Sequence, residues 1–129
     1  ARGPYALQAA IVACHARAHA AEETDWARIA ALYAELADVM PSPVVELNRA
    51  VAVGMAHGPA AGLELADALK DEPSMQRYHL LPSVRADLLF KLGRWEEARL
   101  EFERAASLTR NIRQREQLLE LAKACEARA

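Results

Sequence analysis

A cysteine and two histidines near the start of the chain are the residues whose types and spacing best suit metal binding. His15 and His19 are four residues apart, so on a helix they share one face, as zinc-binding histidines do, and Cys14 precedes them directly. The spacer between the histidines lacks the glutamate that a zinc protease uses as its base, and His57 and His79 are isolated. Because a stable zinc site needs three or four ligands, we predict no metal site and no other cofactor.

Paired carboxylates are the other groups that could perform acid–base chemistry. Glu22-Glu23 and Glu96-Glu97 fall at predicted helix starts, where acidic side chains stabilise the positive end of the helix dipole. The sequence contains no nucleophile elbow, no phosphate-binding glycine loop and no dinucleotide fingerprint. Since no nucleophile can be paired with a base, we predict that the chain is not an enzyme.

Polar residues inside two apolar helical runs are the candidate binding residues. Glu46, Asn48 and Arg49 interrupt a valine-rich run, and Arg85 and Asp87 interrupt a leucine-rich one. In one interpretation these five side chains line a concave groove and bind a partner. In the other, Glu46, Arg49 and Arg85 form an ion-pair network between adjacent helix pairs, because buried charges are paired. We favour ion pairs for the charged residues and the groove for Asn48.

Turn and capping signals divide the chain into seven helical segments that would position these residues. The expected ranges are 4–21, 25–40, 43–57, 59–71, 81–92, 94–108 and 111 onward, with an irregular connection over 74–79. Gly93 is expected to end a helix in the left-handed conformation. Three side chains are expected to cap helix N-termini: Thr24, Ser42 and Asn111. The third segment is expected to bury an apolar stripe: Val44, Leu47, Val51 and Met55.

The composition predicts an all-α fold. Hydrophobic residues make up 53% of the 129 residues and aromatic residues only 5%, because alanine supplies much of the apolar fraction. Alanine has the highest helix propensity, and the abundant leucine, glutamate and arginine follow it closely. Residues that favour strands are sparse. The length fits one domain over residues 1–129 with a core of its own.

Charge and cysteine content restrict the class of protein further. The formal net charge is −2 and the arginines are scattered among acidic residues, so the chain lacks the basic face of a nucleic-acid-binding domain. Cys14 and Cys125 form no disulfide framework, and neither a signal peptide nor an apolar run of transmembrane length is evident. We expect a cytoplasmic protein outside the membrane. The start at Ala1 in place of methionine indicates a fragment or a processed product.

Two stretches that lie 69 residues apart indicate an internal repeat. At that offset Trp26 corresponds to Trp95 and Tyr33 to Phe102. The offset is about twice the ~34-residue period of tetratricopeptide arrays, and the residues between would supply a middle unit. Small residues let paired helices approach closely, while large ones fill the grooves between pairs. We predict a tetratricopeptide-like stack of three helical hairpins, with the seventh helix as a C-terminal cap.

Several segments, in order, resemble the C-terminal extension of certain extracytoplasmic-function (ECF) RNA polymerase sigma factors. The most specific is SPVVELNRAVAV at residues 42–53. The others are GPYALQAAI at 3–11, DWARIAALY at 25–33, GPAAGL at 58–63, YHLL at 78–81 and RADLL at 85–89. The resemblance covers nearly the whole chain and fades after residue 111.

The resemblance implies a tetratricopeptide-like regulatory domain that follows sigma regions 2 and 4, which are not in this chain. Its implied partners are the sigma regions of the same polypeptide, core RNA polymerase, or both, with promoter DNA bound only through the missing upstream regions. The family's promoter-binding residues therefore match no position here. Two alternatives stay open: a small-ligand sensor that uses the concave groove, and a general scaffold unrelated to transcription. The signal, the target promoters and the oligomeric state are not predicted.

Overall fold

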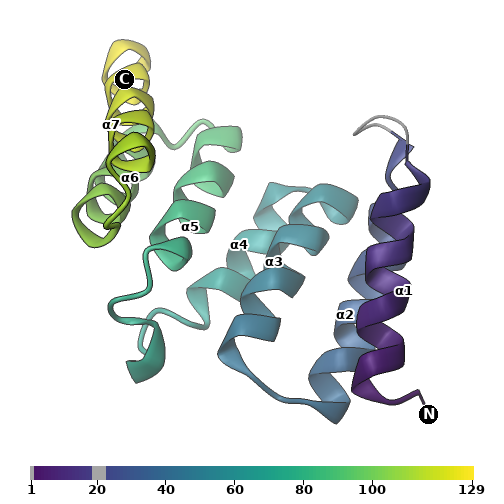
Figure 1. Cartoon of the computed structure of the whole chain (residues 1–129). Helices are drawn as coiled ribbons and strands as arrows, with labels where there is room; N and C mark the ends of the chain where they lie inside the picture. Colours follow the sequence, from purple (N-terminus) through teal and green to yellow (C-terminus); the bar gives the residue numbers. More distant parts are fainter. Residues whose placement is uncertain (1, 19–22) are drawn as a thin grey trace. The chain divides into compact units, whose positions relative to one another are not determined.

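The computed structural model covers the whole chain and describes residues 2–18 and 23–129. All regular secondary structure in these residues is helical, and consecutive helices pack in pairs (Figure 1), which confirms the predicted all-α helical-hairpin fold. The elements are α1 (Pro4–Arg17), α2 (Trp26–Val39), α3 (Pro43–His57), α4 (Pro59–Asp67), the 3-10 helix η2 (Pro73–Met75), α5 (Leu80–Lys91), α6 (Trp95–Leu108) and α7 (Ile112–Arg128).

The helices gather into two compact units, an N-terminal unit of residues 1–65 and a C-terminal unit of residues 66–129. The division falls within α4. The expectation of one domain over the whole chain stays a prediction. No described helix has the length and apolarity that crossing a membrane requires.

Most helix ends follow the predicted capping signals. The side chains of Ser42 and Asn111 cap α3 and α7, each accepting a hydrogen bond from a backbone N–H in the first turn. Gly93 has a φ of +75° just after α5, and its N–H donates to the carbonyl of Phe90. The next N–H, of Arg94, donates to the carbonyl of Leu89, which completes a Schellman motif.

Three predicted boundaries are wrong. The cap of α2 is Asp25 and not Thr24, because the Asp25 carboxylate accepts from the N–H of Arg28 at 3.1 Å. Helix α1 ends at Arg17 with extended backbone at residue 18, and the rest of its predicted range, 19–22, lies outside the described residues. Helix α4 ends at Asp67, after which the chain tightens into turns with hydrogen bonds three residues apart.

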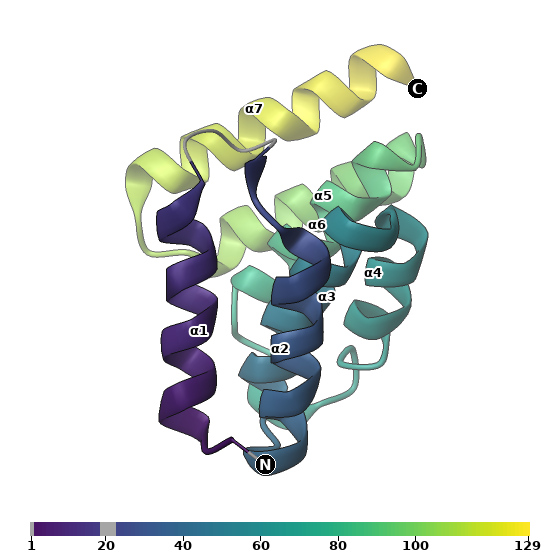
Figure 2. The ribbon, with the colours of Figure 1, turned by 90° about the vertical axis from the view of Figure 1, so that its right-hand side faces the viewer.

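In the N-terminal unit, α1 and α2 run antiparallel side by side (Figures 1 and 2), and α3 packs against α2. The buried residues of this core come from all three helices: Leu7, Ile11, Cys14, Ile29, Ala30, Leu32, Leu36, Val45 and Ala52. Helix α4 then crosses α3 at Gly62. A Cβ atom there would lie 2.7 Å from the carbonyl oxygen of Ala50 and 2.8 Å from the Cα of Gly54, so the crossing needs glycine.

The buried face of α3 differs from the predicted one. Leu47 is buried as expected, but Val44, Val51 and Met55 are exposed. The helix buries a neighbouring stripe in their place: Val45, Leu47, Ala50 and Ala52. Sequence periodicity cannot choose between two adjacent stripes that are both apolar. The close approach of α2 and α4 selects the stripe that contains Ala50 and Ala52.

In the C-terminal unit, α5 packs on α6, and α7, the predicted cap helix, packs on α6 as well. The core here is lined by Ala86, Leu89, Ala98, Phe102, Ala105, Leu118, Ala122 and Cys125. The Arg115 guanidinium donates to the carbonyls of Ala106 and Thr109, which ties α7 to the end of α6. Cys14 and Cys125 are both free and buried, and burial raises the pKa of the Cys125 thiol.

The internal repeat is visible in the helices themselves. Helices α2 and α6 each begin at a tryptophan and span 14 residues, and their first residues are Trp26 and Trp95. At the same offset, Ile29 and Ala98 are both buried. Both tryptophan rings make edge-to-face contacts, with His15 at 5.4 Å and with Phe90 at 4.9 Å respectively, as expected for packing residues.

Candidate functional site: a groove between α1 and α3

A groove of about 450 Å³ lies between α1 and α3 in the N-terminal unit. Its walls carry Gln8 and Val12 from α1 and Val44 and Asn48 from α3, and Leu36 of α2 lies at its base. Asn48 therefore lies on a groove of the N-terminal unit, and its predicted place on a concave surface shared with Asp87 stays a prediction. Most of the other lining side chains are apolar, so the groove offers hydrophobic contact around two neutral amides.

The two helices expose apolar side chains on the faces that carry Gln8 and Asn48, within the groove and beside it. On α1, Tyr5 and Val12 lie on one helical face with Gln8 between them, and their exposed fractions are 86% and 66%. On α3, Val44 and Val51 share a face with Asn48 and are 43% and 37% exposed. Exposed apolar side chains that cluster on adjacent helices are typical of protein-interaction surfaces.

The polar groups of the groove are suited to recognising a peptide backbone. The amides of Gln8 and Asn48 can each donate and accept, and neither side chain carries a charge. Tyr33 also lines the groove, and burial raises the pKa of its hydroxyl, so this group stays protonated at neutral pH. The groove can thus supply hydrogen bonds to a partner without a large desolvation cost for charge.

The other predicted site residues on α3 form a local ion pair. Arg49 Nη1 lies 3.5 Å from Glu46 Oε2, three residues apart on the helix, and both side chains are one-third exposed. Nε of Arg49 is buried and has no hydrogen-bond partner. Arg49 is therefore incompletely paired within the described residues. An unsatisfied buried donor of this kind destabilises a fold by about 1–3 kcal/mol.

Arg85 has different partners from those predicted. Its Nε donates to Asp67 at 2.8 Å and its Nη1 contacts Glu101 at 2.5 Å, in place of the expected Glu46 and Arg49 network. Asp67 ends α4 and Glu101 lies on α6, so the bridge joins Arg85 to two other helices, one of which is its own hairpin partner. Burial acts to lower the pKa of Arg85, but the hydrogen bonds and charges of both carboxylates outweigh it and raise the pKa.

Asp87 is exposed on α5, and its carboxylate pairs with Lys91 one turn later at 3.0 Å. It belongs to the C-terminal unit, so its predicted place in one groove with Asn48 stays a prediction. Of the weighed metal ligands, Cys14 is buried, His15 packs on Trp26, and His19 lies outside the described residues. The described ranges contain no group of three residues able to hold a metal ion.

Sequence reasoning missed the apolar half of this groove. Val44 and Val51 were assigned to the core, and Tyr5 and Val12 were not assigned at all. A signal was present, since Tyr5, Gln8 and Val12 recur at helical spacing on a different face of α1 from its buried residues. This spacing identifies a groove only when it is known which helix covers each face of α1, and that depends on the tertiary packing.

Comparison with known proteins shows one informative likeness. The chain is 48% identical over 109 residues to an uncharacterized protein of Rhizobium meliloti (strain 1021). The matched part is 84% of this chain but 25% of that protein, so the chain spans about a quarter of its relative's length. No protein-family model matches the chain. No solved structure matches it either.

Proposed function

We propose that this chain is the protein-interaction and regulatory domain of a bacterial ECF sigma factor, a cytoplasmic protein that takes part in transcription initiation. The observation that carries an interaction role is the α1–α3 groove, where both helices expose apolar side chains around Gln8 and Asn48. The transcriptional context comes from the ordered resemblance of segments such as residues 42–53. The domain itself performs no catalysis.

The partner is a segment of the sigma regions of the same polypeptide or of core RNA polymerase. Contiguous exposed apolar surface is unfavourable in water and becomes favourable when a partner covers it, with about 25 cal/mol gained per Å² buried. The paired helices hold Val12 and Val44 in place before binding, which lowers the entropic cost of association. The groove is therefore suited to a short helical or extended segment with apolar side chains.

Regulation follows if the domain binds one arrangement of the sigma regions better than another. A bound domain shifts such an equilibrium only by its differential affinity for the two states. Engagement of the groove would hold the sigma regions in the arrangement that is competent for polymerase or promoter binding, or in the incompetent one. Whichever arrangement the domain favours, loss of the groove is expected to change transcription.

The test is made in the full-length polypeptide that carries this chain. Residues 1–129 are deleted, and run-off transcription from genomic DNA is measured with core RNA polymerase. We expect the set or the level of specific transcripts to change by at least about tenfold, the effect of roughly 1.4 kcal/mol of coupling. Unchanged transcripts and unchanged binding to core polymerase would refute the proposal.

Point variants then separate the groove from the rest of the domain. The double change Val12→Glu and Val44→Glu places two charges in the groove at already exposed positions. Val39→Glu is the matched control, because Val39 is 43% exposed on α2 and does not line the groove. The double variant should reproduce the deletion with an unchanged melting temperature, whereas the control should behave as the wild type.

A further inference from the structure

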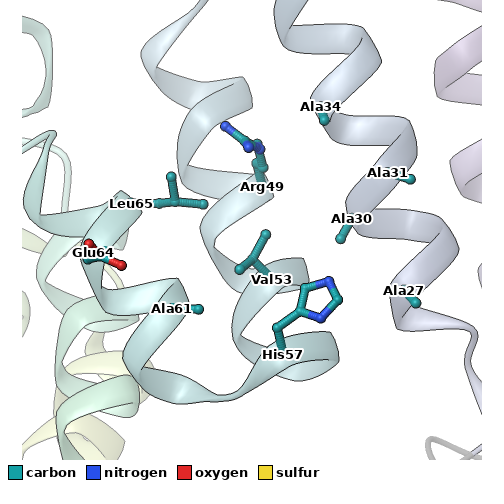
Figure 3. Close-up of a pocket in the computed structure, with 10 residues that line it drawn as sticks. All are labelled: Ala27, Ala30, Ala31, Ala34, Arg49, Val53, His57, Ala61, Glu64 and Leu65. Carbon is teal, nitrogen blue, oxygen red and sulfur yellow. The ribbon is translucent and has the colours of Figure 1, made fainter.

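A second cavity, of about 580 Å³, opens on a different side of α3, between α2 and α4 (Figure 3). On α2 it is bordered by small side chains, including Ala30 and Ala31, and on α4 by Leu65. Arg49 and His57 mark the two ends of the stretch of α3 beside it, with Val53 between them (Figure 3). All these residues belong to the N-terminal unit, so the cavity is built within one compact body.

Arg49 is the polar group of this cavity that lacks a satisfactory partner. Its Nε is buried and makes no hydrogen bond, and its contact with Glu46 is long, at 3.5 Å. A guanidinium presents its N–H groups in a planar fork that matches a carboxylate. The Arg49 side chain is one-third exposed, so a carboxylate placed in the cavity would accept from its Nη groups, while Nε stays buried.

The other walls indicate what such a carboxylate would carry. The alanines of α2 leave room for apolar atoms, and Val53 and Leu65 provide apolar contact. The volume falls in the range of about 300–1,000 Å³ that small-molecule sites occupy. Glu64 is exposed and also borders the cavity, so a second negative charge on the ligand would be repelled.

We propose that this cavity binds a small monocarboxylic acid with a short aliphatic tail, its carboxylate on Arg49 and its tail against Val53, Leu65 and the alanines of α2. The site is distinct from the α1–α3 groove, since Asn48 lines the groove and the next residue, Arg49, lines the cavity. The inference does not depend on the proposed role in transcription. It can be tested on the 129-residue chain alone.

The probe is sodium hexanoate, titrated into the ¹⁵N-labelled chain and followed by two-dimensional NMR. We expect saturable shifts of amides in α2, α3 and α4 around the cavity. Hexylamine and succinate, at equal concentration and ionic strength, should cause no such shifts, because one lacks the carboxylate and the other adds a second charge. Absence of saturable hexanoate shifts, or equal shifts with hexylamine, would overturn the proposal.

Two variants locate the site. Arg49→Gln should weaken hexanoate binding by at least tenfold, whereas Arg28→Gln, which removes an exposed arginine of α2 that does not line the cavity, should leave it unchanged. Ala31→Leu fills the cavity from an exposed position and should also abolish binding. Melting temperatures establish that each variant is folded. Hexanoate affinity that is unchanged by Arg49→Gln or by Ala31→Leu contradicts the assignment.

Discussion

Arg85 shows how one charged side chain can join three helices. Its side chain is only 13% exposed on α5, and it bridges Asp67 at the end of α4 and Glu101 on α6. Taking these groups out of water is costly, so the arrangement holds only while each charge is compensated. The arginine therefore fixes how Asp67 and α6 sit against α5 within the C-terminal unit.

The Arg85→Met variant should be destabilised by about 2–3 kcal/mol, because Glu101 would be left as a largely buried carboxylate without its partner. Urea unfolding followed by Trp95 fluorescence, in a background without Trp26, measures this. Arg94→Met is the matched control, since its pair with Glu97 is about half exposed and should contribute little to stability. Equal unfolding midpoints for the two variants would show that the Arg85 bridge does not support the fold.

The sequence identified these charged residues but not their partners. Arg49 and Arg85 stand out because they interrupt apolar runs, and unpaired charge in such runs is unfavourable. Their partners depend on how one helix is rotated and shifted against the next. For Arg85 that register brings Asp67 and Glu101 into reach, which are 18 and 16 residues away in sequence.

At the scale of helices, local capping chemistry was the most predictable feature. Ser42, Gly93 and Asn111 act as predicted, because a cap involves only residues within one turn. The error at α2 is of the same local kind, since Thr24 and Asp25 are adjacent and both can cap a helix. The aspartate cap has the further advantage of a negative charge at the helix N-terminus.

Replacing Asn111 with alanine should destabilise the C-terminal unit by about 1 kcal/mol, because the N–H of Gln114 loses the acceptor that now lies 3.0 Å away. Asn111→Asp should retain the cap and most of the stability. Thermal unfolding gives the magnitude, and hydrogen exchange of the first amides of α7 gives the location. Unchanged exchange at Gln114 in the alanine variant would mean that this cap does not hold the helix start.

The crossing of α3 and α4 is an element-scale feature that no local pattern revealed. Gly62 looks like an unfavourable residue in a helix, yet its missing Cβ is what lets the backbones of the two helices meet. Gly54 lies directly opposite, so glycine faces glycine across the contact. Only the spatial pairing of the two helices gives these residues their meaning.

Gly62→Ala should therefore destabilise the N-terminal unit by about 1–3 kcal/mol, although alanine is the better helix former. The new Cβ would lie within 2.7 Å of a backbone oxygen, and backbone cannot rotate away as a side chain can. Urea unfolding followed by Trp26 fluorescence in a Trp95→Phe background measures the change. Gly3→Ala is the control, because a Cβ there meets no atom within 4 Å. A stabilised Gly62→Ala variant would contradict the close crossing.

At the scale of the whole chain, composition and repeat period were sufficient to predict the class of fold. Alanine-rich helices separated by proline and glycine bury their alanine-lined faces against each other. The 69-residue offset makes α2 and α6 equivalent helices of the repeat. The grooves were less predictable, because they form where helices fail to cover one another. Val44 and Val51 look the same in sequence whether they are covered or open.

The distribution of charge over the whole chain makes a last prediction. The 16 basic residues are balanced by 18 acidic ones, and many pair along their own helix, as Arg94 does with Glu97 and Lys91 with Asp87. With a net charge of −2, the chain has no excess of cations with which to displace counterions from a nucleic acid. Fluorescence anisotropy with duplex DNA at about 150 mM salt should show no binding tighter than about 10⁻⁴ M, weaker than typical non-specific binding. Under the proposed function, the full-length polypeptide should bind its promoter with a salt dependence that deletion of residues 1–129 leaves unchanged. A steeper salt dependence in the presence of this domain would show that it contacts phosphates directly, and the partner of its groove would then have to be reconsidered.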